Sequence, residues 1–268
     1  MRTYVRDVMR RLFPKAMHAR ARSHLKWKEI EEDLLPVVVD PEREAVDVGA
    51  NVGRYAIALS TLARHVYAFA PDTELAAFLA RAAPPNLDVF PEALSDREGP
   101  RRFRVPVIDG ELAVAVAAID DDDSAVVADD ELRVVHATTL NRLAGRDIGF
   151  VKIDVEGHEL SVLRGGCELL ERRHPVVLVE VEERHEHGGL AAVTEFFTKL
   201  DYAGFFVYED RSRGIDEFSL DLQDPDELAK PVNRRDMLYV NNFFFAQVSS
   251  VAELRRRIDD RLRAHSST

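Results

Sequence analysis

From residue 44 onward, the chain alternates short, nearly continuous apolar runs with segments whose apolar residues recur every three or four positions. The apolar runs are rich in Val, Ile and Phe, which is typical of strands covered on both faces of a sheet. The expected strands cover residues 45–48, 65–69, 87–94, 150–155, 176–182, 205–208 and 237–245. The expected helices cover residues 54–64, 74–81, 159–172 and 191–200. This alternation predicts an α/β fold with helices on both faces of a mostly parallel sheet.

The chain between the third and fourth expected strands interrupts this alternation. Two segments, residues 102–107 and 113–119, flank Asp109-Gly110, and this arrangement predicts an inserted β-hairpin. The end of the chain has apolar residues at helical spacing, which predicts a C-terminal helix over residues 251–268 that docks on the domain.

Charge divides the chain into a basic beginning and an acidic remainder. Residues 1–30 hold nine Lys/Arg and two Asp/Glu, a balance of +7, so a net charge of -12 leaves -19 for the rest. Residues 1–13 fit a helix with a short apolar stripe and several arginines off it. Such a helix could dock on the protein, which we favour because Pro14 ends the stripe, or lie on an anionic membrane surface.

Composition excludes several classes of protein. The hydrophobic fraction of 46% is too high for a disordered chain, and no apolar run approaches the roughly 18 residues of a membrane span. The acidic balance argues against a nucleic-acid partner, because neutralising phosphates requires clustered Lys and Arg. The single cysteine, Cys167, excludes an intrachain disulfide and favours a cytoplasmic location. We expect a basic N-terminal helical extension (1–40), a central domain (41–250) and the C-terminal helix.

The most informative segment is the turn after the first strand, which contains Asp47, Gly49, Asn51 and Gly53. Its glycines permit a tight turn and a close approach of backbone to ligand, and the following helix offers unpaired N–H groups. The dinucleotide fingerprint has a third close glycine, so a nicotinamide-dependent oxidoreductase is disfavoured. An acid at the end of the strand suits a ligand with a positively charged amino group, such as S-adenosylmethionine, better than a diphosphate.

Four blocks of sequence resemble the FkbM family of S-adenosylmethionine-dependent methyltransferases. They are VDVGANVGRYA (46–56), VYAFAPD (66–72), EALSDREG (92–99) and TLNRLAGRDIGFVKIDVEGHELSVLRGG (139–166). The resemblance implies a Rossmann-like class I methyltransferase fold and transfer of a methyl group to a hydroxyl oxygen. The acceptor that it implies is a small molecule, either a sugar or a secondary metabolite.

The resemblance also assigns residues to the cofactor. Asp47, Gly49, Asn51 and Gly53 are expected to hold the methionine end of S-adenosylmethionine. The segment Glu92-Ala93-Leu94, which closes the third expected strand, is expected to border the adenine.

One position departs from the family pattern. Members usually carry an acid at the end of the second strand, where it holds the ribose hydroxyls, but this chain has Ala70, with Asp72 and Glu74 as nearby substitutes. Losing such a charge-assisted hydrogen bond costs about 1.5–3 kcal/mol, which weakens a cofactor site. The alternative to an active enzyme is therefore a catalytically weakened or inactive binding module with the methyltransferase fold.

The candidate catalytic residues follow the fourth and fifth expected strands. Ligands of open α/β sheets bind beyond the carboxyl ends of the strands, and a hydroxyl acceptor needs a base. Asp154 is the first candidate to position the acceptor or take its proton, and His158 is the second. Glu156 faces the same side as Asp154 if the strand continues extended, and Glu180 is expected at the mouth of the cleft. Lys152 is expected to pair with Asp154.

A metal ion at this segment is conceivable but not favoured. Carboxylates of Asp154 and Glu156 suit Mg²⁺, whereas His158 is a poor ligand for it, and no second carboxylate cluster has a defined spacing. The expected cofactor is therefore S-adenosylmethionine without a required metal.

Overall fold

A computed structural model describes residues 29–108, 111–112, 117–119, 130–226 and 239–266. The helix expected in residues 1–13, the hairpin turn at 109–110 and the first residues of the expected strand 237–245 lie outside the described residues.

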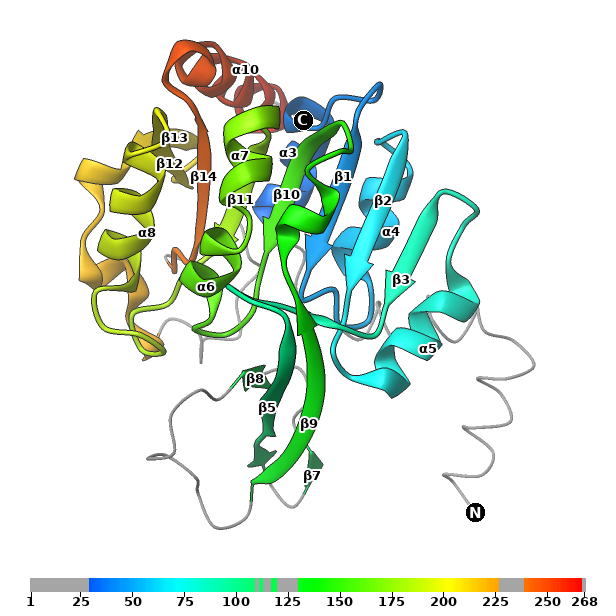
Figure 1. The fold of residues 1–268 in the computed structure, drawn as a ribbon. Coiled ribbons are helices and arrows are strands. Elements are labelled where there is room, and N and C mark those ends of the chain that lie inside the picture. The colour runs from blue at the N-terminus through cyan, green and yellow to red at the C-terminus, as the bar shows by residue number, and fades with distance from the viewer. Residues whose placement is uncertain (1–28, 109–110, 113–116, 120–129, 227–238, 267–268) are drawn as a thin grey trace.

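An eight-stranded sheet forms the centre of the protein, with the strand order β13-β12-β14-β11-β10-β1-β2-β3 (Figure 1). Its strands are β1 (Glu44–Val48), β2 (His65–Phe69), β3 (Leu87–Phe90), β10 (Ile148–Ile153), β11 (Val176–Glu180), β12 (Tyr202–Tyr208), β13 (Arg211–Gly214) and β14 (Asn242–Gln247). The ladders from β3 to β11 are all parallel, and β14 and β13 pair antiparallel to their neighbours. The strand order reverses between β1 and β10, where such sheets form a ligand crevice.

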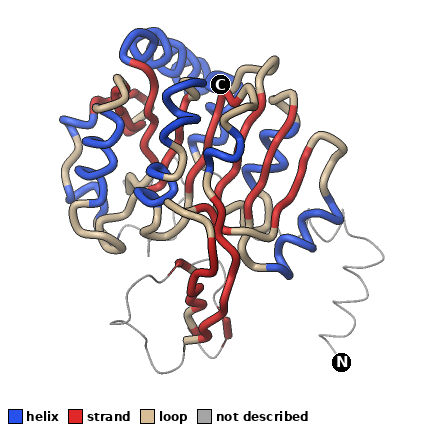
Figure 2. Tube along the Cα trace, in the orientation of Figure 1, coloured by secondary structure: helices blue, strands red, loops and turns tan. Residues whose placement is uncertain are grey.

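Helices cover both faces of this sheet, as the sequence predicts (Figure 2). One face packs against α3 (Ile30–Val38), α4 (Arg54–Ser60), α5 (Thr73–Ala82) and α10 (Val248–Ser266). The other packs against η2 (Leu140–Leu143), α6 (Glu159–Arg164), α7 (Cys167–Arg173) and α8 (Gly189–Thr198). The two short helices η3 (Ile215–Glu217) and η4 (Leu220–Gln223) precede β14. Side chains alternate along β1, so Ala45 packs on the face covered by α3, α4, α5 and α10. Val46 and Val48 pack on the face covered by η2, α6, α7 and α8.

A smaller sheet extends as an arm from the carboxyl edge of the large one (Figure 1). It contains β4 (Ala93–Leu94), β9 (Glu131–Thr138), β5 (Gly99–Val105) and β8 (Ala118–Ile119), in that order. The expected hairpin is correct in part, because Phe103 lies opposite Ile119, and β6 (Val107–Ile108) pairs with β7 (Glu111–Leu112). The main partner of β5, however, is β9, which the hydrophobic pattern did not predict. The pattern fails there because β9 exposes Leu132 and Val134 on its outer face.

Two expected elements are divided in the structure. The expected strand 87–94 becomes β3 and β4, which lie in different sheets, with Pro91 between them. The expected helix 159–172 becomes α6 and α7, with Gly165-Gly166 between them. A Cβ on Gly165 would lie 2.0 Å from the carbonyl oxygen of Ser95, so the helix ends where the arm crosses it closely.

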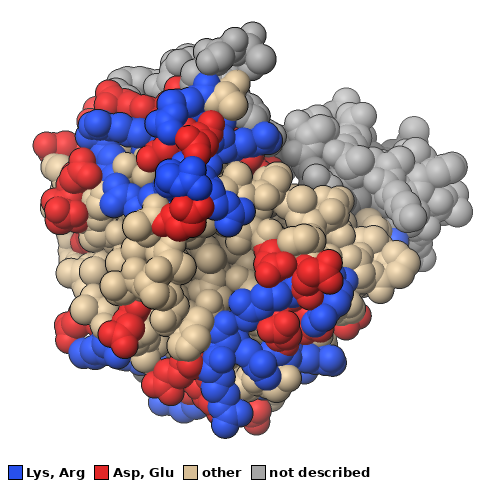
Figure 3. All heavy atoms as spheres, turned by 90° about the horizontal axis from the view of Figure 1, so that it is seen from above, with Lys and Arg blue, Asp and Glu red and all other residues tan. Residues whose placement is uncertain are grey.

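The C-terminal helix is confirmed as a docking helix. Leu254, Ile258 and Leu262 of α10 are buried in the core beside α3. The face seen from above in Figure 3 carries intermixed acidic and basic side chains around a wide band of uncharged residues. Within α10, Arg256 pairs with Glu253 and Asp260. Within the part of the chain that the structure describes, no helix is both long and apolar enough to cross a membrane.

Candidate functional site

A cavity of about 670 Å³, including solvent at its mouth, opens at the carboxyl edge of the large sheet. It brings together most of the residues that the sequence singles out: Gly49, Asn51, Asp72, Glu92, Ala93, Leu94, Asp154, Glu156 and His158. Ala70 also lines it. Asp47, Gly53, Glu74 and Glu180 are not among its lining residues.

The turn after β1 and the end of β10 touch each other across the floor of this cavity. Gly49 has a φ of 82°, and a Cβ at this position would lie 1.8 Å from the carbonyl oxygen of Asp154. The backbone N–H of Asp154 donates to the carbonyl of Val48 at 3.0 Å. Glycine is therefore required at position 49 by the close approach of the protein's own backbone.

Two residues of the turn, Gly53 and Asp47, lie behind the lining of the cavity. Gly53 has a φ of 77° and precedes α4, and a Cβ there would lie 2.2 Å from the side chain of Leu79. Asp47 is buried on the α4 side of the sheet, opposite Lys152 in the ladder. Burial raises the pKa of Asp47 to about 7. Its Oδ2 atom has no hydrogen-bond partner among the described residues.

Asp72, the nearest acid to Ala70, is already engaged. Its Oδ1 atom accepts the backbone N–H groups of Glu74 and Leu75 at 2.9 and 2.8 Å, and it thereby caps α5. Its Oδ2 atom pairs with Arg133 of the arm at 2.5 Å. Glu74 is exposed. An acid therefore lines this part of the cavity, but an arginine neutralises it.

The wall beyond β3 is also neutralised by an arginine. Glu92 pairs with Arg142 at 2.5 Å. The guanidinium of Arg142 lies 5.0 Å from the ring centre of Phe90 and 5.8 Å from that of Phe69. Sequence reasoning missed Arg142, which lies within a block that carries the family resemblance but gives no local signal for this contact.

The arm supplies an apolar wall that the sequence analysis did not assign. Phe103 of β5 and Ala118 and Ile119 of β8 line the cavity. Phe103 is buried, and its inward position follows from the alternation along β5. The pairing of β5 with β8 brings these residues together. The signal for this pairing in the sequence was the predicted hairpin of residues 102–107 and 113–119.

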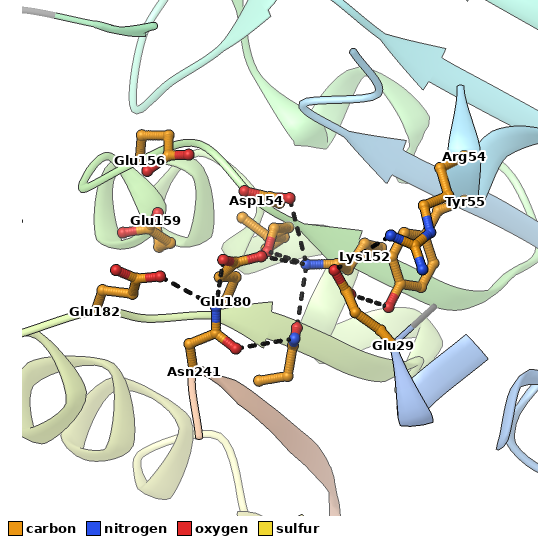
Figure 4. A network of polar contacts seen from close by, with 12 residues as sticks. Glu29, Arg54, Tyr55, Lys152, Asp154, Glu156, Glu159, Glu180, Glu182 and Asn241 are labelled. Atoms are coloured by element: carbon orange, nitrogen blue, oxygen red, sulfur yellow. Dashed lines mark hydrogen bonds and ion pairs between the residues drawn. The ribbon is translucent and has the colours of Figure 1, made fainter. Parts of the chain in front are cut away.

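A buried lysine lies beside the acid at the end of β10 (Figure 4). The Nζ atom of Lys152 is 3.8 Å from Asp154 and 3.6 Å from Glu180, so the expected pairing with Asp154 is confirmed. Burial acts to lower the pKa of Lys152, but Asp154, Glu180 and Asp47 outweigh it and the net shift is upward. Lys152 is therefore a buried cation that holds the carboxylate of Asp154.

From the sequence, Glu156 is expected on the same side as Asp154 on the condition that the strand continues extended. The structure does not meet this condition. β10 ends at Ile153, and Glu156 has a φ of 53°. Its carboxylate still lines the cavity, 3.1 Å from Nε2 of His185. Burial, with repulsion from Asp154, raises the pKa of Glu156 to about 7. His185 was not among the predicted site residues.

His158 precedes α6 and is buried in the wall of the cavity. Its Nε2 atom lies 3.0 Å from Oγ of Ser95, and Ser95 donates its hydroxyl hydrogen to Asp96 at 3.2 Å. Because that hydrogen is already used, we assign the ring proton to Nε2, which donates to Ser95. Nδ1 of the neutral ring is then a hydrogen-bond acceptor.

The charges of the cavity differ between its two ends. The described lining residues include four carboxylates, Asp72, Glu92, Asp154 and Glu156, and no Lys or Arg. The first two form close pairs with arginines, whereas the last two meet one buried lysine and a histidine. This distribution of charge therefore suits a ligand that is cationic at one end and uncharged at the other. No group of three or more His, Cys, Asp or Glu in the described residues is placed to hold a metal ion.

Comparison with known proteins gives one family match. The profile of the family described as the methyltransferase FkbM domain matches residues 47–207. The search of curated proteins found no significant match.

Solved structures with similar folds include several methyltransferases. The FkbM methyltransferase of Methylobacillus flagellatus KT is 14% identical with a TM-score of 0.48, over 89% of this chain and 60% of that one. An rRNA methylase from Streptococcus thermophilus is 13% identical with a TM-score of 0.43, over 81% and 92% of the two chains. A Streptococcus mutans protein solved in complex with SAH is 13% identical with a TM-score of 0.41, over 81% and 94%. This chain thus spans about 60% of the Methylobacillus protein.

Proposed function

This chain belongs to the FkbM methyltransferase domain family, and from this premise we propose that it transfers a methyl group from S-adenosylmethionine to a hydroxyl oxygen of a sugar or secondary metabolite. The observation that carries the proposal is the cavity between the turn at Gly49 and the acid Asp154, at the reversal of strand order. Its acidic end matches the positive charge of a sulfonium and an ammonium group.

The residues of the cavity fit this cofactor. When bound, S-adenosylmethionine supplies an activated methyl group on a sulfonium. Asn51 and the backbone at Gly49 would hold its methionine end, and Leu94, Phe103 and Ile119 would pack on its adenine. Asp47 and Gly53 would act indirectly, by shaping the turn.

Two side chains are suited to the proton of an acceptor hydroxyl. Asp154 lines the cavity and is held by Lys152, so its carboxylate would orient the hydroxyl and accept its proton. His158 is the second candidate, because it lines the cavity and its hydrogen bond with Ser95 fixes the orientation of its ring. Glu156 lines this end of the cavity and Glu180 lies beside Lys152, and no metal ion is required for these roles.

A second candidate function is that of a binding module with little or no catalysis. Ala70 favours it, because the nearest acid, Asp72, already accepts three hydrogen bonds. Calorimetric titration with S-adenosylmethionine, followed by an assay of SAH formation with a panel of hydroxylated acceptors, distinguishes the two. Binding and turnover support the enzyme, binding without turnover supports the module, and no heat at millimolar cofactor contradicts both.

Two further expectations accompany this proposal. A cytoplasmic location is supported by the single cysteine, and an acceptor other than nucleic acid is supported by the net charge of -12.

A further inference from the structure

A second cavity of about 610 Å³ lies near the first, at the same edge of the sheet. It is bounded by the first turn of α3, the end of β12 and the segment that leads into β14. Among its lining residues are Glu31, Tyr208, Tyr239 and Asn242, and none of the described lining residues is Lys or Arg. The proposed function leaves this cavity without a role.

Glu31 is the exceptional residue of this second cavity. Its side chain is only 7% exposed, and no other described residue hydrogen-bonds or pairs with its carboxylate. Burial raises the pKa of Glu31 to about 7, against the opposing effects of a hydrogen bond from its own backbone N–H and of the positive charges of Lys152 and Arg54. A buried carboxylate without a partner is costly, so a ligand that donates a hydrogen bond to it gains affinity.

Three other polar side chains of the cavity are already engaged. Glu209 pairs with Arg213 at 2.6 Å. The Nδ2 atom of Asn241 donates to Glu180 at 2.5 Å, and Oδ1 of Asn242 accepts from Lys152 at 3.3 Å. Glu31 is therefore the carboxylate that remains for a ligand.

One lysine contacts a residue of each cavity, and Figure 4 shows it beside Asp154. Nζ of Lys152 contacts Asn242, which lines the second cavity, and lies 3.8 Å from Asp154, which lines the first. A ligand that contacts Asn242 in the second cavity is thus linked through Asn242 and Lys152 to the acid proposed to orient the acceptor hydroxyl.

We propose that the second cavity binds the methyl acceptor, that Glu31 anchors it, and that the acceptor is a polyhydroxylated compound without negative charge whose affinity increases when it carries an amino group. This inference rests on the proposed function. The carboxylate of Glu31 accepts hydrogen bonds from hydroxyl or ammonium groups, whereas none of the described lining residues is a Lys or Arg that could pair with a phosphate or carboxylate.

Three probes on one carbon skeleton test the ligand class: N-methylglucamine, sorbitol and sorbitol 6-phosphate. Ligand-observed saturation-transfer NMR at a pH above 7 measures their binding to the full chain. We expect N-methylglucamine to bind about tenfold more tightly than sorbitol, which corresponds to one pKa unit of differential interaction, and sorbitol 6-phosphate not to saturate. Equal or tighter binding of the phosphate, or no saturable binding of any probe, overturns the proposal.

The variant Glu31→Gln keeps the shape of the side chain and an acceptor oxygen but removes its charge. It is expected to lose the preference for the amine and to bind sorbitol within about twofold of the wild type. Glu42→Gln, at an exposed position outside both cavities, removes the same charge and should keep the preference. A preference that survives in Glu31→Gln overturns the role of Glu31, and the wild-type ranking tests the ligand class independently of any variant.

Calorimetry with S-adenosylmethionine on the same samples separates this inference from the proposed function. Cofactor binding with no probe binding overturns only the acceptor cavity. Probe binding with no cofactor binding overturns the proposed function and leaves the ligand class of the second cavity in place.

Discussion

Ala70 places a methyl group where the family usually has an acid. The neighbouring acids of the cavity do not replace the missing carboxylate, because they are already paired. Asp72 is close in sequence but caps α5 and pairs with Arg133. Glu92 pairs with Arg142. The ribose end of the proposed cofactor site therefore contains no unpaired carboxylate among the described lining residues.

Restoring the acid should strengthen cofactor binding. Ala70→Glu is expected to lower the Kd for S-adenosylmethionine by roughly one to two decades, because a carboxylate gains charge-assisted hydrogen bonds from two ribose hydroxyls. Isothermal titration calorimetry measures this change. Ala70→Gln, which cannot provide the charge, should give a smaller gain, and an unchanged Kd in Ala70→Glu would place the ribose elsewhere.

The ring of His158 should carry its proton on Nε2. Nitrogen NMR shifts of labelled histidine distinguish the two tautomers of a neutral ring, and the hydrogen bond to Ser95 favours this one. Ser95→Ala removes the acceptor and should shift the ring toward a mixture of tautomers. Ser60→Ala, remote from this ring, should leave the spectrum unchanged, and a proton on Nδ1 in the wild type would remove His158 as the proposed second base.

At the scale of elements, the junction of α6 and α7 shows how a glycine pair shapes the site. A Cβ on Gly165 would meet the carbonyl oxygen of Ser95 at 2.0 Å, and one on Gly166 would meet the side chain of Leu140 at 2.7 Å. Ser95 is the residue that orients His158. The glycines therefore allow the arm to lie close enough to α6 for that hydrogen bond to form.

Gly165→Ala should consequently destabilise the protein. We expect a loss of about 1–3 kcal/mol or more in the free energy of unfolding, because backbone must move to admit the methyl group. Urea unfolding monitored by circular dichroism measures it. Gly145→Ala is the matched control, since a Cβ there meets nothing within 4 Å, and it should be neutral or slightly stabilising. Equal effects of the two variants would contradict this account.

The central strands could be predicted from the sequence because strands buried on both faces are continuously apolar. Strand β9 of the arm could not, because it carries Leu132 and Val134 on its exposed face and Arg133 on its inner face. For the site, the two motif loops identify Gly49, Asn51, Asp154 and His158. The contributions of Arg133, Arg142 and Phe103 depend on long-range pairing, which no local pattern encodes.

At the scale of the whole molecule, several buried acids make stability depend on pH. Burial raises the pKa of each of Glu31, Asp47, Glu156 and Glu159 to about 7. An acid whose pKa is raised in the folded state binds its proton more tightly there than in the unfolded state. Its ionisation therefore lowers the free energy of unfolding, with no effect below its unfolded pKa and the full effect above pH 7. Glu182 acts oppositely: burial favours its neutral form, but hydrogen bonds from His185 and Arg184 hold its pKa at about 2. Glu182 therefore stabilises the folded protein above its unfolded pKa, and this stabilisation is lost as the pH falls toward 2.

The unfolding free energy of the ligand-free protein should therefore fall between about pH 5 and about pH 8. Glu159 accepts a hydrogen bond from the N–H of Gly157 at 2.9 Å, and a glutamine oxygen can keep it. Glu159→Gln should add up to about 3 kcal/mol near pH 8 and nothing near pH 4, measured by urea unfolding. Glu42→Gln, at an exposed position, should show no such difference. If both variants have the stability of the wild type at pH 8, the burial argument is contradicted.

The missing side chain of Gly49 has a mechanical consequence. With the backbones of the first loop and of Asp154 in contact, and with Val48 and Asp154 hydrogen-bonded, the two segments must move as one body. Any shift of the loop on engaging a cofactor is transmitted to the acid that faces the acceptor. Loading of the methyl donor and alignment of its target are in this way two outcomes of a single displacement.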